Sequence, residues 1–476
     1  MTKETTGITA FYRRLGPGFL PFADALSEDL PFFRLLRLSL FQLSVGMSAV
    51  LLTGTLNRVM IVELSVPAWI VSAMVSLPLL FAPFRALIGH RSDMHRSAFG
   101  WRRGPFIWFG SLLQFGGLAI MPFALFVLSG DATGHFWVGY VAAALAFLMV
   151  GAGMHTVQTA GLALATDISS EDARPRVVAL LYVMLLLGMA ISALLFGLVL
   201  RDFTQLRLVQ IIQGAALVTM LLNMAALWKQ EARRPQAEAG ERSLDFLTSW
   251  RGFTSRPGAR RLLAATGIGA AAFAMQDVLL EPYGGEVLGM SVSGTTSLTA
   301  VFALGSILGF ALPARWLARA KEPHRIAAMG ILLGVTGFTA VVLSTVVGGQ
   351  ALFVSAVGLI GVGGGLFAVC TLISAMGLAE DHGHGIALGA WGAVQASCTG
   401  IAIAIGGAVR DVVSFLADQQ ALGPALTSAT PAYDAVYITE IVLLFAALAV
   451  IGPLAKHSPD PQSPRLDRLR IEAFPN

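Results

Sequence analysis

Long apolar stretches constrain this chain more than any other feature of its sequence. A helix needs roughly 20 mostly apolar residues to cross a bilayer, and twelve stretches of about that length follow one another. The expected spans are 36–57, 68–89, 105–128, 136–164, 177–200, 207–228, 262–281, 294–314, 325–347, 351–378, 385–408 and 434–455. The sequence therefore predicts an all-α integral membrane protein with twelve transmembrane helices.

The composition supports the membrane class. Of 476 residues, 55% are apolar and only 13% are charged, about half the charged share of a soluble domain. The net charge of +4 is spread over short segments between apolar runs, with no basic patch interleaved with aromatic residues. Nucleic acid is therefore not an expected partner. Cys370 and Cys398 lie inside apolar runs and are interpreted as buried hydrophobes, not as a disulfide or metal ligands.

The basic residues predict the orientation in the membrane. Lys and Arg concentrate on the cytoplasmic side of membrane proteins. With a cytoplasmic N-terminus, the inner segments hold 27 of the 32 basic residues. The outer segments hold only Arg58, Arg201, Arg207 and Arg410. We therefore expect a multi-pass protein with both termini in the cytoplasm and no cleavable signal peptide.

One hydrophilic interruption, 229–261, divides the chain into two halves of six spans. We expect a cytoplasmic lead-in over 1–35, an N-terminal half over 36–228, a C-terminal half over 262–455 and a cytoplasmic tail over 456–476. The interruption itself is expected to be a charged cytoplasmic linker.

A weak internal repeat supports this division. VGAGMHTVQTAGLALA from Val150 parallels IGVGGGLFAVCTLISA from Ile360, and LNRV from Leu56 parallels MQDV from Met275. Two six-helix halves with corresponding segments predict the major facilitator fold.

Four segments resemble a particular branch of that superfamily. FRALIGHRSD, GWRRGPFIW, QTAGLALATD and above all QDVLLEPYGGEVLG, from Gln276 to Gly289, are similar to the PucC/LhaA family, the bacteriochlorophyll delivery branch. The resemblance extends from about Leu15 to Lys456.

The resemblance implies an assembly factor for bacterial light-harvesting antenna complexes. Such a protein would hold antenna polypeptides and deliver bacteriochlorophyll, with the core antenna favoured over the peripheral one. Implied partners are antenna polypeptides, the reaction centre core, bacteriochlorophyll synthase and membrane lipid. The implied location is the bacterial inner membrane, in its intracytoplasmic photosynthetic part.

A transporter of a small or amphipathic solute is the alternative, because a fold does not fix a function. Few titratable groups are expected near mid-membrane, and Asp277 and Glu281 are placed near the outer end of their span. This pattern favours assembly over proton-coupled transport. The sequence shows no catalytic triad, zinc-ligand spacing or nucleotide-binding loop, so we expect neither an enzyme nor a metal site.

Polar residues inside spans are candidate pigment contacts, because they are costly in lipid. His155 could ligate the magnesium of bacteriochlorophyll, and Gln158 lies one turn away on the same face. Gln114, Gln276 and Gln395 could bond pigment keto groups. For all of these, hydrogen bonding between helices is the alternative interpretation.

The run GVGGG from Gly361 superficially resembles a phosphate-binding loop. It lies inside an apolar span and follows no strand, so that interpretation fails. We expect its glycines to let helices pack closely, and Gly151 and Gly153 to do the same in the matching span.

The loop after the second span suggests a cytoplasmic latch. Gly89, Asp93, Arg102 and Arg103 resemble the facilitator loop signature, with a longer spacing between the acid and the arginines. Asp167 and Arg176 lie in the next inner loop. They could form a latch with that arginine pair or a local cluster of ion pairs between neighbouring helices.

The repeat also predicts an ion pair between the halves. The offset of the LNRV and MQDV segments places Arg58 of the first span opposite Asp277 of the seventh. A charged residue in a span needs a partner. We expect Asp277 to be that partner, with Glu281, one turn further along, as the second choice.

Overall fold

The computed structural model contains helices and connecting turns throughout the part of the chain that it describes. The described residues are 32–80, 101, 103–129, 136–169, 174–230, 255–256, 258–317, 322–347, 349–378, 384–421, 423 and 428–456. Most of the lead-in, of the linker and of the tail expected from the sequence lies outside these residues, although an α-helix already begins at Phe32.

The first half begins with a compound crossing. It consists of α2 (Phe32–Val50), the π-helix η2 (Leu51–Thr55), α3 (Leu56–Arg58) and the π-helix η3 (Val59–Glu63). The helices that follow are α4 (Ala68–Leu80), α6 (Gly104–Leu128), α7 (Phe136–Asp167), α8 (Arg174–Val199) and α9 (Gln205–Leu227).

The second half begins with a broken crossing, formed by α11 (Ala259–Ala274) and the short α12 (Leu280–Glu286). It continues with α13 (Val292–Leu317), α14 (Pro323–Val347), α15 (Gln350–Gly377), α16 (His384–Asp418) and α17 (Thr430–Lys456). The predicted spans and these helices agree closely at most ends, and α16 extends ten residues beyond its predicted limit of 408.

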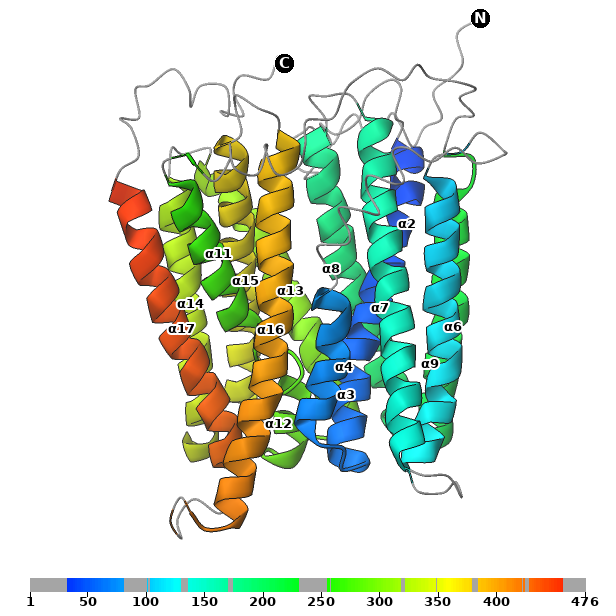
Figure 1. Cartoon of the computed structure of the whole chain (residues 1–476), viewed down its shortest axis with the longest axis vertical. Helices are drawn as coiled ribbons and strands as arrows, with labels where there is room; N and C mark the ends of the chain where they lie inside the picture. The colour runs from blue at the N-terminus through cyan, green and yellow to red at the C-terminus, as the bar shows by residue number, and fades with distance from the viewer. Residues whose placement is uncertain are drawn as a thin grey trace, which may run out of the picture.

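Among the described residues, ten helices are long and apolar enough to cross a membrane. The other two predicted crossings correspond to α4, whose apolar part is shorter, and to the broken α11–α12 pair. The helix count is thus consistent with twelve crossings. Figure 1 shows α2 beginning and α17 ending at the same end of the bundle, which we call the terminal end. The opposite end, where α3 and α12 lie, is called the distal end.

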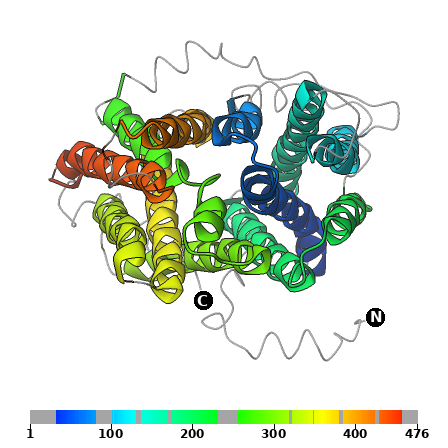
Figure 2. The same ribbon diagram turned by 90° about the horizontal axis from the view of Figure 1, so that it is seen from below.

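The two halves lie side by side, with the helices up to α9 on one side and those from α11 onward on the other (Figure 2). Two helix pairs join them, α4 with α16 and α8 with α13. A third contact is made by the compound first crossing, whose η2, α3 and η3 pack against α12. Most of the large buried side chains form one continuous core cluster that extends through both halves.

Glycines set the closest helix approaches, as predicted. A Cβ on Gly361 would overlap the carbonyl oxygen of Phe302 in α13, and one on Gly363 would lie 2.6 Å from the carbonyl oxygen of Gly330 in α14. In α7, a Cβ on Gly153 would lie 2.5 Å from the backbone nitrogen of Gln114 in α6. Because any larger side chain would push these backbones apart, the packing role of both glycine runs is confirmed.

Candidate functional site at the interface of the halves

The first crossing departs from α-helical geometry where it meets the second half. Two π-helical segments, η2 and η3, flank the three residues of α3. Such segments are uncommon and often mark functional sites. Asn57 and Arg58 lie between them, with 0% and 5% of their surfaces exposed.

The seventh crossing is interrupted at the same level. Residues 275–279 form turns between α11 and α12, although the sequence predicted a continuous span over 262–281. The side-chain nitrogen of Asn57 lies 3.5 Å from the carbonyl oxygen of Asp277. An irregular stretch of the second half therefore lies against the irregular stretch of the first. In membrane transporters, broken helices of this kind form ligand sites.

The predicted ion pair between Arg58 and Asp277 is wrong, because Arg58 pairs with another residue. Nη1 of Arg58 lies 2.5 Å from Oε1 of Glu63, in the same crossing. In an α-helix, two residues five positions apart point about 140° away from each other. The π-helical turn of η3 closes with hydrogen bonds five residues apart, so it brings Glu63 to Arg58.

Arg58 nevertheless lies at the second half. A Cβ on Gly285 of α12 would be 3.1 Å from its Nη2 atom. Its guanidinium therefore lies beside α12, the helix that carries Glu281, the second predicted partner.

Glu281 is buried at the contact between the halves. It is 1% exposed, and its Oε1 accepts a hydrogen bond of 2.7 Å from Thr299 of α13. On the other side, a Cβ on Gly54 of η2 would overlap Oε1. No donor among the described residues bonds its other oxygen, Oε2.

A second buried carboxylate, that of Glu440, bonds to the backbone at the break between α11 and α12. Oε1 of Glu440 in α17 accepts a hydrogen bond of 2.7 Å from the backbone nitrogen of Gln276. Glu440 has no exposed surface. Three buried tyrosines lie between Glu440 and the distal end, and the ring centroid of Tyr283 is 5.5 Å from that of Tyr433 and 5.3 Å from that of Tyr437.

A charged network joins four elements at the distal end. Arg410 of α16 pairs with Glu286 of α12 at 2.7 Å and with its neighbour Asp411 at 2.9 Å. The hydroxyl of Tyr433 donates to Glu286 at 2.8 Å. Asp411 also accepts the backbone N–H of Trp69 in α4 at 2.8 Å, which links the halves.

Gln114 serves as an interhelical amide. Its Nε2 atom donates to the carbonyl oxygen of Ser44 in α2 at 3.1 Å, and also bonds Ser48. Its Oε1 accepts from Asn223 of α9 at 3.2 Å. These bonds connect α2, α6 and α9 and occupy the amide groups that a pigment would use.

The other pigment candidates do not form one site. His155 and Gln158 are buried on α7, and Nε2 of Gln158 lies 3.5 Å from Oε1 of Gln42 in α2. Gln395 is half-buried on α16, in the other half. The nitrogen atoms of His155 suit a magnesium ligand chemically, but with 8% of its surface exposed the residue has no open face for a macrocycle in this conformation.

The structure brings together two of the six predicted latch residues. Nε of Arg103 lies 3.1 Å from Oδ2 of Asp167, at the terminal end. This pair joins α7 to the start of α6, within the first half. Gly89, Asp93 and Arg102 lie outside the described residues, as does the side chain of Arg176.

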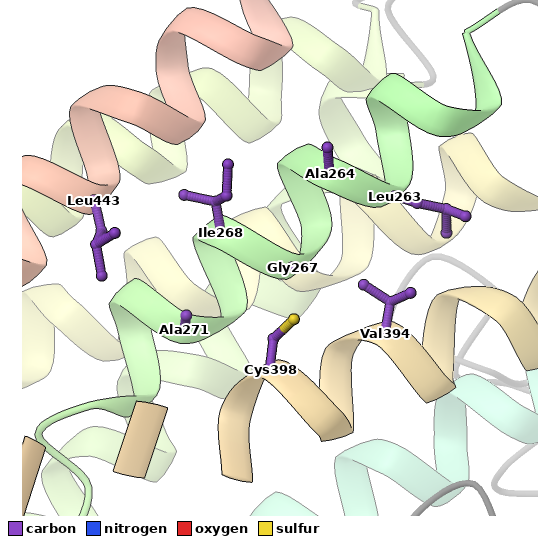
Figure 3. Close-up of a pocket in the computed structure, with 8 residues that line it drawn as sticks. All are labelled: Leu263, Ala264, Gly267, Ile268, Ala271, Val394, Cys398 and Leu443. Atoms are coloured by element: carbon purple, nitrogen blue, oxygen red, sulfur yellow. The ribbon is translucent and has the colours of Figure 1, made fainter. Parts of the chain in front are cut away.

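An apolar groove of about 460 Å³ lies between α11, α16 and α17 (Figure 3). Val394 and Cys398 of α16 line it opposite Leu263, Gly267 and Ile268 of α11. It contains no charged side chain and none of the predicted pigment contacts. Across the described residues, no group of three or more His, Cys, Asp and Glu residues could hold a metal ion.

The fold is that of known membrane transporters. A bacterial homologue of the human lysosomal transporter Spinster, in an inward-facing and unoccupied conformation, matches with a TM-score of 0.69. That match covers 91% of this chain and 100% of the other, at 14% identity. A bacterial homologue of the iron transporter ferroportin, in an inward-facing state, matches with a TM-score of 0.62 at 14% identity, over 89% and 98% of the two chains. The molecule therefore belongs to the class of multi-pass membrane proteins with the major facilitator fold.

Within that class, the chain belongs to the PucC family. The family model described as PUCC protein matches residues 55–458. A protein encoded in the puhA-bchM intergenic region of Rhodobacter capsulatus, described as uncharacterized, is 54% identical over 95% of this chain and 96% of its own. Protein PucC of Rhodovulum sulfidophilum is 55% identical over 84% and 89% of the two chains. These relatives connect the family to photosynthetic bacteria.

Sequence reasoning missed Glu63, Glu286 and Glu440. Glu440 could have been found, because it is an acidic residue in the predicted span 434–455 and an intramembrane carboxylate is a candidate functional group. Glu63 and Glu286 lie outside the predicted spans 36–57 and 262–281, so they did not stand out as intramembrane carboxylates. Acidic residues also contribute little to membrane orientation. The π-helical segments of the first crossing had no signal in the sequence pattern.

Proposed function

We propose that this protein is an assembly factor for bacterial light-harvesting antenna complexes, with the core antenna as its favoured client. It would hold newly made antenna polypeptides in the membrane until they join the ring around the reaction centre. The observation that carries the proposal is membership of the PucC family, through relatives that match almost the whole chain.

The physical character of the molecule supports this role. Its long helices expose many large apolar side chains, among them Phe109, Phe123 and Phe126 of α6. In lipid, helices associate through packing and interhelical hydrogen bonds and not through a hydrophobic driving force. A client helix would therefore be held laterally by close packing against such an outer face. Reaction centre core polypeptides and bacteriochlorophyll synthase are proposed as further partners.

Delivery of bacteriochlorophyll is part of the proposal, but no step depends on it. A relative in Rhodobacter capsulatus, 28% identical over 83% of this chain and 91% of its own, is named bacteriochlorophyll synthase 44.5 kDa chain. His155 would be the magnesium ligand, and α7 would have to separate from its neighbours to admit the macrocycle. We propose no catalytic role.

Transport of a small or amphipathic solute is the second candidate. The broken α11–α12 crossing and the buried Glu281, both at the contact of the halves, favour it. In transporter folds, discontinuous helices and intramembrane carboxylates mark substrate and ion sites.

Gentle purification from phototrophic membranes tests the first proposal. Affinity-tagged protein should carry antenna polypeptides in near-stoichiometric amount, whereas a tagged unrelated twelve-span transporter from the same membranes should not. Equal amounts of antenna polypeptide on both proteins would contradict the assembly role. Uptake of a defined solute by proteoliposomes, with no antenna polypeptide bound, would support the transporter.

A further inference from the structure

We infer that Glu281 is a proton-binding site and that Arg58 exchanges Glu63 for Glu281 when that proton leaves. The exchange would change how tightly the two halves are joined at their distal contact. This inference concerns the motion of the molecule and holds for either of the proposed functions.

Arg58 and Glu281 each have one buried polar atom that makes no hydrogen bond within the part of the chain that the structure describes. Nε of Arg58 and Oε2 of Glu281 are both buried, and neither has a hydrogen-bond partner among the described residues. The guanidinium of Arg58 packs on Gly285 of α12, four residues beyond Glu281. A buried polar atom left without a partner is costly, so a second arrangement that joins the two is favourable to form.

The present arrangement fits a neutral Glu281. Glu281 is 1% exposed, and Arg58 is paired with Glu63 instead. A buried ionised carboxylate without a partner would be far more costly than a protonated one. The proton is therefore placed on Oε2, because Oε1 accepts the hydroxyl of Thr299.

Few other charged groups face Glu281. The elements packed on α12 include η2, α3, η3 and α13. Through Glu286 and Tyr283, α12 also contacts α16 and α17. From η2, α3, η3 and α13, only Arg58 and Glu63 bring charge, because η2 has no ionisable residue and Arg315 is in the last turn of α13. The charged residues of α16 and α17 in this region are Arg410, Asp411, Asp434 and Glu440. In the same crossing, Asp277 precedes Glu281 by one turn, and Tyr283 and Glu286 follow it.

The exchange is balanced in atoms and charge. The O–H bond of Glu281 breaks, its electron pair remains on the carboxylate, and the proton passes to water at the distal end, where the Glu63 side chain is 39% exposed. The bond from Nη1 of Arg58 to Glu63 breaks, and one from Nε of Arg58 to Oε2 of Glu281 forms. Arg58 then joins the first half to the second, whereas before it was paired within the first half.

Infrared difference spectroscopy of the full chain in nanodiscs tests this directly. When the pH is raised from 6 to 9, the wild-type protein should lose the C=O band of a protonated carboxylic acid. The Glu281→Gln variant should lack the part of that band that comes from Glu281. Asp277→Asn, one turn away, and Glu440→Gln, the other buried carboxylate, are the matched controls and should retain it.

A second variant tests the partner exchange. Glu63→Gln frees Arg58 for Glu281, so the pH at which the band disappears should fall by about one unit or more. Because Glu63→Gln keeps Glu281 intact, it remains informative if Glu281→Gln does not accumulate. Absence of the acid band from wild-type protein at pH 6, or an unchanged midpoint in Glu63→Gln, would overturn the inference.

Discussion

The backbone N–H of Gln276 donates a hydrogen bond to Oε1 of Glu440, 164 residues further along the chain, at 2.7 Å. Gln276 lies in the turns that interrupt the seventh crossing, where an α-helix would otherwise satisfy the backbone groups. Glu440 lies in the middle of α17 and has no exposed surface. A side chain of the twelfth crossing therefore caps the break in the seventh.

Substitutions of Glu440 should separate capping from charge. Glu440→Gln keeps an oxygen acceptor and should unfold near the wild-type temperature. Glu440→Leu leaves the N–H of Gln276 without a partner, which should cost about 1–3 kcal/mol and lower the midpoint of thermal unfolding in nanodiscs. Equal midpoints for the two variants would contradict the capping role.

Packing at the glycine run offers a second test. Gly361→Ala should lower membrane accumulation, because its Cβ would overlap the carbonyl oxygen of Phe302 and overpacking costs about 1–3 kcal/mol. The control is Gly392→Ala in α16, where nothing lies within 4 Å of the added Cβ. That variant should accumulate like wild type, and a similar loss in both would show that helix approach is not the cause.

Features of the fold and of the site could be predicted from the sequence where nearby residues determine them, and not where a distant residue does. The predicted span 105–128 became α6 (Gly104–Leu128), because apolar length alone determines a regular crossing. The break after Ala274 could not be predicted in this way, because its cap comes from Glu440 in a distant helix. The repeat correctly placed Arg58 at the seventh crossing, but its partner Glu63 depended on a π-helical turn. The roles of His155 and Gln395 stay predictions.

Orientation is tested by reporter fusions. The excess of basic residues in the inner segments predicts that reporters placed after Lys229 and after Lys456 both lie in the cytoplasm. The structure places the last turn of α9 and the end of α17 at the terminal end (Figure 1), in keeping with a shared side. A reporter on the outer side at either position would mean that the span count is wrong by an odd number.

Pigment contact is tested by two matched alanine variants. His155→Ala should reduce co-purifying bacteriochlorophyll more than Gln395→Ala does, because an imidazole nitrogen is the better magnesium ligand. Pigment is measured by absorption per mole of purified protein. The same pigment content in both variants, at equal protein yield, would favour a helix-bridging role for His155.

Deletion of the gene tests the central claim most directly. In a phototrophic host that lacks the chain, near-infrared absorption of intact membranes should show a severalfold loss of core antenna complex, while cells still make bacteriochlorophyll. Wild-type chain supplied in trans should restore the complex. Unchanged antenna abundance, or loss of bacteriochlorophyll synthesis while antenna polypeptides are supplied in excess, would contradict the proposal that this protein is an antenna assembly factor.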